Sequence, residues 1–202
     1  MEILISAIID FIDKHYHQKK IKKVLKNLKI KTVIDIGAHK GEFLNCILSI
    51  NKKLIIYAFE PQSLIFRKLK KNFKSSNNIF IFNKALSNSN EKKKLNINIK
   101  TSTSTFSTYN RDSYWKKIKD FILTGFKQSS FISSEIVKTI TLDNFINSKK
   151  IKNIDLLKID TEGHELEVLN GAKKTLNNKI EYILIEFHFS KIYEKYNRSK
   201  IE

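Results

Sequence analysis

Hydrophobic residues of this chain gather in short continuous runs, and the stretches between these runs place apolar residues at helical spacing. Runs of this kind are typical of parallel strands that are buried on both faces of a sheet. We expect strands over residues 32–36, 54–59, 79–83, 136–140, 154–159 and 180–187. We expect the main helices over residues 42–50, 62–73 and 162–176. This alternation predicts an α/β fold with a mostly parallel sheet, right-handed crossovers and helices on both faces.

Two segments depart from this alternation. Residues 84–100 predict a hairpin-like excursion with its turn at residues 88–90. Residues 101–134 are rich in Ser and Thr and contain several aromatic side chains, which suits either a lid or acceptor-binding wall, or an amphipathic packing helix. Thr141 is a candidate N-cap for a short helix that follows the strand over residues 136–140.

The length and composition of the chain predict one compact domain. The chain has 202 residues, 41% of them hydrophobic, and no internal repeat or low-complexity linker. We expect an N-terminal helical segment over residues 1–30 and the α/β domain over residues 31–202. The apolar residues 1–11 are too short to span a bilayer and lack a basic leader, and Cys46 has no cysteine partner. We therefore expect a cytoplasmic protein.

The chain carries a formal net charge of +18, which suggests a nucleic-acid partner. Clustered cations gain affinity for phosphates by releasing counterions. Here lysine supplies almost all of the charge, and the arginines, Arg67, Arg111 and Arg198, lie far apart in sequence. The lysine clusters fall at helical spacings that are typical of solvated faces. We expect no nucleic-acid partner, and a basic nucleic-acid-binding protein is the alternative hypothesis.

A candidate ligand site follows the first predicted strand. Asp35 lies near the end of that strand, and Gly37 and Gly41 flank the turn into the next helix. Glycine lets a backbone turn tightly and pass close to a ligand. The second strand leads into Glu60 and Pro61, where a carboxylate can accept two hydrogen bonds from a ribose diol. The spacing predicts a nucleoside-containing cofactor at the carboxyl edge of the sheet.

The turn itself distinguishes between two such cofactors. A dinucleotide site needs a second glycine where this chain has His39, so binding of a nicotinamide dinucleotide is not expected. S-adenosylmethionine carries no phosphate, but its amino-acid end has an ammonium and a carboxylate. Asp35 is a candidate partner for the ammonium, and the backbone amides of the turn are candidates for the carboxylate. We therefore favour S-adenosylmethionine.

A second group of polar residues follows the strand over residues 154–159. Asp160 is expected at the same edge of the sheet as Glu60, where a carboxylate can orient a substrate hydroxyl and help to remove its proton. Glu162 and Glu165 either join this site or stabilise the N-terminus of the next helix through its dipole. The sequence leaves both interpretations open.

Glu186 and His188 end the last predicted strand and are expected at the same edge. Two hypotheses remain open for these residues. They either form an oxygen-and-nitrogen metal site with Asp160, or His188 acts as a general base. A divalent metal is not the favoured cofactor. His164 is expected to be a partly buried polar residue.

The chain resembles the FkbM family of S-adenosylmethionine-dependent methyltransferases over residues 31–188, in six runs: VIDIGAHKGEF, YAFEP, NKALS, TLDNF, LLKIDTEGHELEVLNGA and ILIEFH. The resemblance implies a Rossmann-like class I methyltransferase fold, with the methyltransferase domain over residues 31–202. It also implies methyl transfer to a hydroxyl oxygen of a sugar, a glycan or a secondary metabolite. RNA methylation is the alternative.

The resemblance also implies roles for individual positions. The methionine part of the cofactor would lie against Asp35, Gly37 and Ala38, and the ribose against Glu60. The remaining implied cofactor-binding residues are Gly41, Pro61, Asn83 and Ala85, the last two near the adenine. The implied catalytic residues are Asp160, facing the transferred methyl group, and His188.

The C-terminal region departs from the family pattern. Methyltransferases of this fold continue past the fifth strand into a helix and two further strands, whereas here only residues 190–202 follow the run that ends at His188. We therefore expect the C-terminal strands to be missing or shortened. Either the chain is truncated, or a partner supplies the missing edge, or a strand is left exposed and can pair with another chain. We therefore expect either reduced stability or a homo-oligomer.

Overall fold

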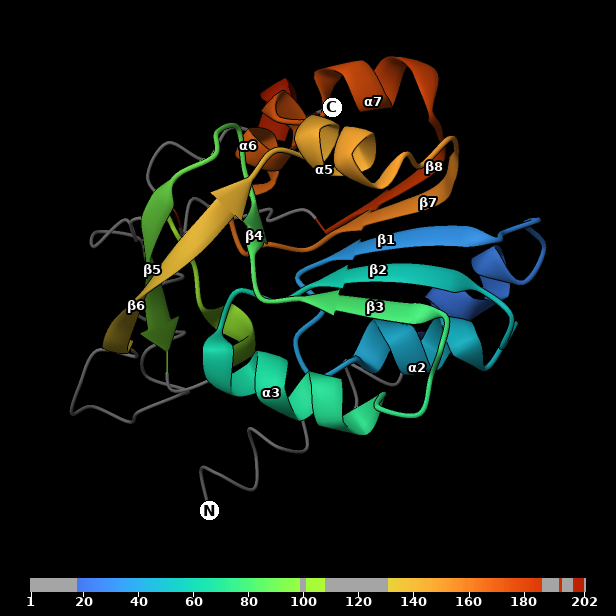
Figure 1. Cartoon of the computed structure of the whole chain (residues 1–202), viewed down its shortest axis with the longest axis horizontal. Helices are drawn as coiled ribbons and strands as arrows, with labels where there is room; N and C mark the ends of the chain where they lie inside the picture. Colours follow the sequence, from blue (N-terminus) through green and yellow to red (C-terminus); the bar gives the residue numbers. More distant parts are fainter. Residues whose placement is uncertain (1–17, 99–100, 108–130, 187–192, 194–197, 202) are drawn as a thin grey trace.

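The computed structural model describes residues 18–98, 101–107, 131–186, 193 and 198–201. Its main sheet has five parallel strands in the order β3-β2-β1-β7-β8 (Figure 1). These strands are β1 (Thr32–Ile36), β2 (Ile55–Phe59), β3 (Ile79–Phe82), β7 (Ile154–Ile159) and β8 (Ile180–Ile185). The predicted parallel α/β sheet is confirmed, and the predicted bounds of β1 and β7 match those of the structure.

Helices cover both faces of this sheet, as expected (Figure 1). One face carries the helical residues 18–25 together with α2 (Glu42–Leu48) and α3 (Ser63–Asn72). The other face carries α5 (Leu142–Lys149), α6 (Glu165–Asn170) and α7 (Lys173–Asn178).

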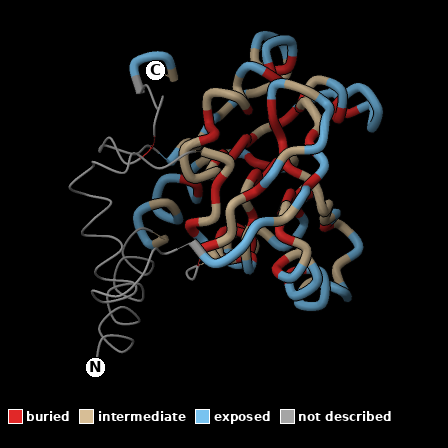
Figure 2. Tube along the Cα trace, turned by 90° about the vertical axis from the view of Figure 1, so that its left-hand side faces the viewer, coloured by how far each residue is buried: buried red, intermediate tan, exposed pale blue. Residues whose placement is uncertain are grey.

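The sheet separates two hydrophobic cores because successive residues of a strand point to opposite faces. In β1, Val33 packs in the core beneath α2, whereas Ile34 packs with Phe145 and Val168 on the other side. Buried residues run through the centre of the molecule, and exposed residues form the outer helix faces and loops (Figure 2). The central strands are therefore sealed from water on both sides.

The prediction of one continuous helix over residues 162–176 is wrong, because the structure has two separate helices there, α6 and α7. Gly171 separates them, and a Cβ atom there would lie 2.0 Å from the carbonyl oxygen of Ser87. Asp143 begins α7 by accepting hydrogen bonds from the backbone amides of Lys174 and Thr175, at 3.1 and 2.8 Å. Contacts with distant residues thus interrupt a pattern that is locally helical.

A second sheet contains β4 (Ala85–Leu86), β5 (Lys92–Asn98) and β6 (Phe131–Ile140), in the order β4-β6-β5. The predicted hairpin over residues 84–100 is wrong, because β4 and β5 each pair with β6 and not with one another. Thr139 links β6 to the residues just before β5, because its backbone amide donates to the carbonyl of Glu91 at 2.8 Å. The predicted strand over residues 136–140 is the end of β6, which begins five residues earlier at Phe131.

Thr141 caps the helix that follows β6. Its side-chain oxygen accepts a hydrogen bond from the backbone amide of Asn144 at 3.2 Å, which confirms the predicted N-cap. The helix carries Phe145, which packs edge-on against the rings of Phe59 and Phe82 at the ends of β2 and β3. These contacts join the small sheet to the main sheet.

The small sheet stands beside the carboxyl ends of the five main strands (Figure 1). Within the described residues, the main sheet ends at β8, which pairs on one side with β7. In the part of the chain that the structure describes, we find no helix that is long and apolar enough to cross a membrane. The carboxyl edge, facing the small sheet, is the place to look for a ligand site.

Candidate functional site

A cavity of about 1040 Å³ lies at the carboxyl edge of the main sheet. β2 and β3 lie on one side of β1, and β7 and β8 lie on the other. The order of strands thus reverses at β1, and open α/β sheets bind ligands at such a point. The volume of the cavity is at the upper end of the usual range for small-molecule sites. The described lining includes Gly37, Ala38, His39, Glu42, Glu60, Pro61, Ala85, Thr101, Phe106, Lys158, Asp160, Glu162, His164 and Glu186.

The turn after β1 forms one wall of the cavity. Gly37 has a φ angle of 82°, and a Cβ atom there would lie 1.8 Å from the carbonyl oxygen of Asp160. Glycine is therefore required at this position by the contact between the two loops. Gly41 has a different role, because a Cβ atom there would lie 2.6 Å from the Phe73 ring and 2.8 Å from Leu69. The structure places Gly41 against α3 and not in the cavity lining.

The backbone amides of this turn already have partners inside the protein. Those of Gly37 and Ala38 donate to the carbonyl of Phe59 at 3.1 and 3.0 Å. The amide of His39 donates to Glu60, and that of Lys40 to Glu42. The turn therefore does not offer the free amides that we expected for the carboxylate of a ligand.

Glu60 lies directly after β2 and is only 2% exposed. Its Oε2 accepts a hydrogen bond from the amide of His39 at 2.8 Å, and its Oε1 accepts one from the amide of Gln62 at 2.9 Å. Burial raises the pKa of Glu60 to about 7, although these two hydrogen bonds oppose the shift. A carboxylate has about four lone-pair positions, so a fixed Glu60 can accept further hydrogen bonds from the cavity.

Three other residues were expected near the nucleoside. Pro61 and Ala85 line the cavity, whereas Asn83 lies behind its lining. The side-chain amide of Asn83 donates to the carbonyls of Glu60 and Pro61 at 3.0 and 2.8 Å. Asn83 therefore fixes the loop that carries Glu60.

Asp35 is fully buried and does not line the cavity. Its Oδ1 lies 3.2 Å from the Nζ of Lys158, the residue opposite it in the pairing of β1 with β7. Lys158 also lies 3.1 Å from Asp160 and donates to the carbonyl of Gly37 at 3.0 Å. Asp35 thus contacts Lys158 beneath the cavity lining, and the structure does not place it where it could contact the ammonium of a ligand.

We assigned no role to Lys158 from the sequence. The signal was present, since a lysine within an apolar strand needs a buried counter-charge and an aspartate occupies the neighbouring strand. Burial alone would lower the pKa of Lys158, but the charges of Asp160 and Asp35 raise it above its usual range. Burial raises the pKa of Asp35, and Lys158 opposes that shift. Lys158 is protonated at neutral pH and holds both carboxylates.

The loop between β7 and α6 presents Asp160 to the cavity. The same loop is fixed by Glu165, whose buried Oε1 accepts hydrogen bonds from the amides of Thr161 and Gly163 at 3.0 and 3.1 Å. Glu165 begins α6 and does not line the cavity, so the structure places it at the helix N-terminus and not in the site. Glu162 lines the cavity, and its Oε2 accepts a hydrogen bond from the hydroxyl of Tyr193 at 2.6 Å.

Residues 101–107 extend along the cavity from the turn after β1 to the loop after β7. At one end, the hydroxyl of Thr101 lies 2.8 Å from the Nε2 of His39. At the other end, the hydroxyls of Thr105 and Ser107 donate to the carbonyls of Glu162 and Gly163. This part of the expected lid or wall therefore does contact the cavity, and residues 108–130 lie outside the described residues.

His164 is buried, and its Nε2 lies 3.0 Å from the hydroxyl of Ser87. Burial, assisted by the charge of Lys93, lowers the pKa of His164 to about 3. His164 is therefore neutral, as suits the expected buried polar residue. His188 lies outside the described residues.

The proposed metal site of Asp160, Glu186 and His188 depends on that undescribed histidine. Among the residues that the structure describes, no three His, Cys, Asp or Glu side chains are arranged to hold a metal ion. Asp160 is instead paired with Lys158, which supplies a positive charge where a metal would be needed.

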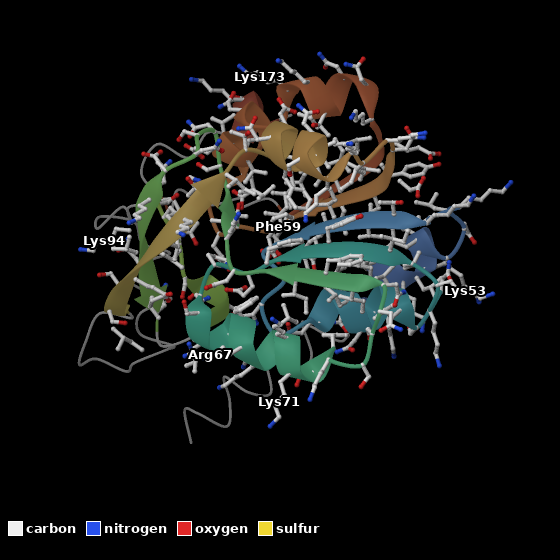
Figure 3. The ribbon with its side chains drawn as sticks, in the orientation of Figure 1. Lys53, Phe59, Arg67, Lys71, Lys94 and Lys173 are labelled. Atoms are coloured by element: carbon white, nitrogen blue, oxygen red, sulfur yellow. The ribbon has the colours of Figure 1, made fainter. Side chains whose placement is uncertain are left out.

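The positive charge of the chain is spread around the molecule. Lys53, Lys71, Lys94 and Lys173 are exposed and point outward from different sides (Figure 3). A nucleic-acid site instead needs cations gathered on one face. The distribution of these side chains does not favour the nucleic-acid alternative.

Two curated relatives resemble most of this chain. It is 26% identical over 155 residues to the hexuronic acid methyltransferase AglP of Haloferax volcanii, covering 76% of this chain and 54% of that protein. It is 23% identical over 173 residues to the 2-O-methyltransferase NoeI of Sinorhizobium fredii strain NGR234, covering 80% of this chain and 65% of that protein. The chain thus spans between about half and two thirds of the length of these relatives. The family model of the methyltransferase FkbM domain matches residues 35–199, and this chain belongs to that family.

Proposed function

We propose that this chain is an S-adenosylmethionine-dependent methyltransferase that acts on a hydroxyl group of a sugar or glycan. The observation that carries the proposal is the placement of Glu60 and Asp160 in one cavity, with the turn after β1 between them. Glu60 has the chemistry to bind a ribose diol, and Asp160 has the chemistry to bind a substrate hydroxyl. Membership of the FkbM methyltransferase family supports this assignment.

The described residues fit the nucleoside part of the cofactor. Glu60 is held in one orientation by two backbone amides, so its remaining lone pairs are ready to accept hydrogen bonds from the ribose. Pro61 and Ala85 add apolar surface to the same cavity, which suits one face of an adenine. Gly37 and Ala38 form the wall between this part of the cavity and Asp160.

The amino-acid end of the cofactor needs a partner other than Asp35. Glu42 lines the cavity at the first turn of α2 and lies 3.5 Å from the Nδ1 of His39. We assign to Glu42 the negative charge that attracts the ammonium group. Ser102 lines the same cavity, and we assign its hydroxyl to the carboxylate, since the turn amides already have partners.

The acceptor is placed at Asp160. The ammonium of Lys158 lies 3.1 Å from the Asp160 carboxylate and holds it in a fixed position, so that Asp160 can accept a hydrogen bond from a hydroxyl group and orient the oxygen. The sulfonium cofactor supplies an activated methyl group when bound. The named activities of the relatives, on hexuronic acid and at a 2-O position, support a sugar as the acceptor.

Calorimetric titration with S-adenosylhomocysteine tests the cofactor site, with NAD as the control ligand. We expect binding of S-adenosylhomocysteine in the micromolar range and no binding of NAD. Transfer of a tritiated methyl group from S-adenosylmethionine to a panel of p-nitrophenyl glycosides then tests the reaction. Failure of the wild-type protein to bind S-adenosylhomocysteine would refute the cofactor site, and binding without transfer to any glycoside would refute the acceptor class.

A further inference from the structure

Asp160 and Glu186 form a pair of carboxyl groups at the ends of two neighbouring strands. Ile159 of β7 lies opposite Ile185 of β8, so the next residue of each strand falls at the same level. The backbone amide of Glu186 donates to the carbonyl of Ile159 at 3.0 Å, which fixes this register. Both side chains line the cavity. The pair therefore faces the space that we assign to the acceptor.

The two members of the pair have different electrostatic partners. The Oδ2 of Asp160 lies 3.1 Å from the ammonium of Lys158. The main influence on Glu186 is the negative charge of Asp160, followed by burial and by the charge of Glu162. Lys158 opposes these effects only in part, and the pKa of Glu186 is raised to about 8.

A carboxylate whose pKa is raised is a stronger base than an ordinary carboxylate, which suits Glu186 to accept a proton near neutral pH. Asp160 is fixed by its ion pair with Lys158, which suits it to orient a hydroxyl group. Glu186 lines the cavity and keeps part of its surface open to solvent, so it can both receive a proton and release it to water.

The other titratable residues of the described lining are less suited to this role. Both ring nitrogens of His39 already have partners. Its Nε2 lies 2.8 Å from the hydroxyl of Thr101, and its Nδ1 lies 3.5 Å from the carboxylate of Glu42. His164 is buried and too weakly basic at neutral pH. Glu162 accepts the hydroxyl hydrogen bond of Tyr193.

We propose that Glu186 is the general base of the reaction and that Asp160 orients the acceptor hydroxyl beside it. The hydroxyl oxygen forms a bond to the methyl carbon while the bond from that carbon to sulfur breaks, and its electron pair stays on the sulfur. The hydroxyl proton passes to the carboxylate of Glu186, which later releases it to water. This role rests on the proposed function, since it requires an acceptor hydroxyl in the cavity.

The role of Glu186 gives the reaction a specific pH dependence. A general base works in its deprotonated form, which becomes the main form of Glu186 as the pH rises through about 8. Among the described residues, the charged groups that act on Glu186 are Asp160, Glu162 and Lys158. At saturating S-adenosylmethionine, where the pH-dependent affinity from Glu60 does not limit the rate, the single-turnover rate of methyl transfer is therefore expected to rise between about pH 6.5 and 9 with a midpoint at about 8.

The test compares Glu186→Gln with Glu181→Gln, the same substitution at the opposite end of β8 in an exposed position. The assay measures single-turnover transfer to the p-nitrophenyl glycoside that the wild-type protein methylates fastest, together with calorimetric affinity for S-adenosylhomocysteine. We expect Glu186→Gln to lower the rate by about 10²- to 10⁴-fold, to abolish the pH dependence and to leave the affinity within about twofold. Glu181→Gln should leave rate, pH profile and affinity unchanged.

Two outcomes would overturn the role of Glu186. A Glu186→Gln variant that keeps the wild-type rate and its rise with pH would assign the base elsewhere, and His188 would then be tested. A flat wild-type pH profile would exclude the role even if Glu186→Gln failed to fold. Absence of methyl transfer by the wild-type protein would instead refute the proposed function, and it would be detected before any variant is made.

Discussion

The carboxylate of Asp35 lies within β1, fully buried and 3.2 Å from the ammonium of Lys158 on the neighbouring strand β7. The same ammonium lies 3.1 Å from Asp160 at the edge of the cavity. A charge inside the sheet is thus connected, through one lysine, to the residue that we assign to the acceptor. The site and the stability of the sheet depend on the same side chain.

Replacing Lys158 by Met should destabilise the fold strongly. The variant leaves the buried Asp35 and the partly buried Asp160 without their counter-charge, and breaking a buried ion pair costs about 3–5 kcal/mol. Urea unfolding measures the change in the free energy of unfolding. The exposed Lys173, substituted in the same way, is the control and should change stability by less than about 0.5 kcal/mol. Similar stability of the two variants would show that Lys158 does not neutralise these carboxylates.

Replacing Gly37 by Ala should separate the loops after β1 and β7. Its φ angle of 82° disfavours alanine, and the new Cβ atom would lie 1.8 Å from the Asp160 carbonyl oxygen. We expect a loss of more than about 2 kcal/mol from this backbone strain and steric overlap. Thermal unfolding and S-adenosylhomocysteine titration would both detect it. Ser75→Ala, at an exposed turn, is the matched small substitution, and a Gly37 variant as stable as Ser75→Ala would contradict the close contact.

Replacing Glu60 by Gln should weaken the binding of S-adenosylhomocysteine by about 10- to 100-fold, because hydrogen bonds to a charged acceptor are worth about 1.5–3 kcal/mol. The pKa of Glu60 is about 7, so the wild-type affinity should rise from pH 6 to 8 as the carboxyl group ionises. Calorimetry at several pH values measures both effects. An affinity that rises equally with pH in the variant would exclude Glu60 as the titrating group.

The same raised pKa affects folding. Between the unfolded value of 4.5 and the folded value of about 7, the folded protein binds the Glu60 proton more tightly than the unfolded chain does. The contribution of Glu60 to stability is therefore largest below pH 4.5 and is lost as the pH rises towards 7. Urea unfolding should show a weaker decline over that interval in Glu60→Gln than in Glu181→Gln.

The edge of β8 should favour self-association. Within the described residues, β8 pairs only with β7, and its Ile183 side chain is 47% exposed. Charged side chains on an edge strand oppose pairing with another chain. Multi-angle light scattering should therefore detect a dimer or larger species for the wild-type protein and a smaller species for Ile183→Lys. A wild-type monomer at all concentrations would refute this prediction.

The sequence was sufficient to predict the parallel sheet because its central strands, β1 and β7, are buried on both faces. Apolar runs of this kind need no information from elsewhere in the chain, and the bounds of β1 and β7 follow directly from them. The FkbM resemblance is likewise confirmed by the family match. The predicted positions of Glu60 and Asp160 at one edge follow from the same rule, since parallel strands share their carboxyl ends.

The errors arise where distant residues decide the structure. The pairing of β5 with β6 joins Leu95 to Glu135, and nothing between residues 84 and 100 indicates that partner. Likewise, Gly171 interrupts a helical pattern because the Ser87 carbonyl lies against it. The role of Lys158 depends on Asp35, which is distant in sequence and becomes its neighbour only when β1 pairs with β7. A charge inside an apolar strand should first be matched with an opposite charge on a neighbouring strand.

The contact between Gly37 and the Asp160 carbonyl also limits how this protein can change during evolution. An insertion in either loop would have to preserve this close approach, so the turn after β1 and the loop that carries Asp160 are expected to vary together. Residues 101–107 contact these loops through hydroxyl groups, which donate to backbone carbonyls or lie beside His39. Side-chain changes are therefore expected to be tolerated more readily in residues 101–107 than at Gly37.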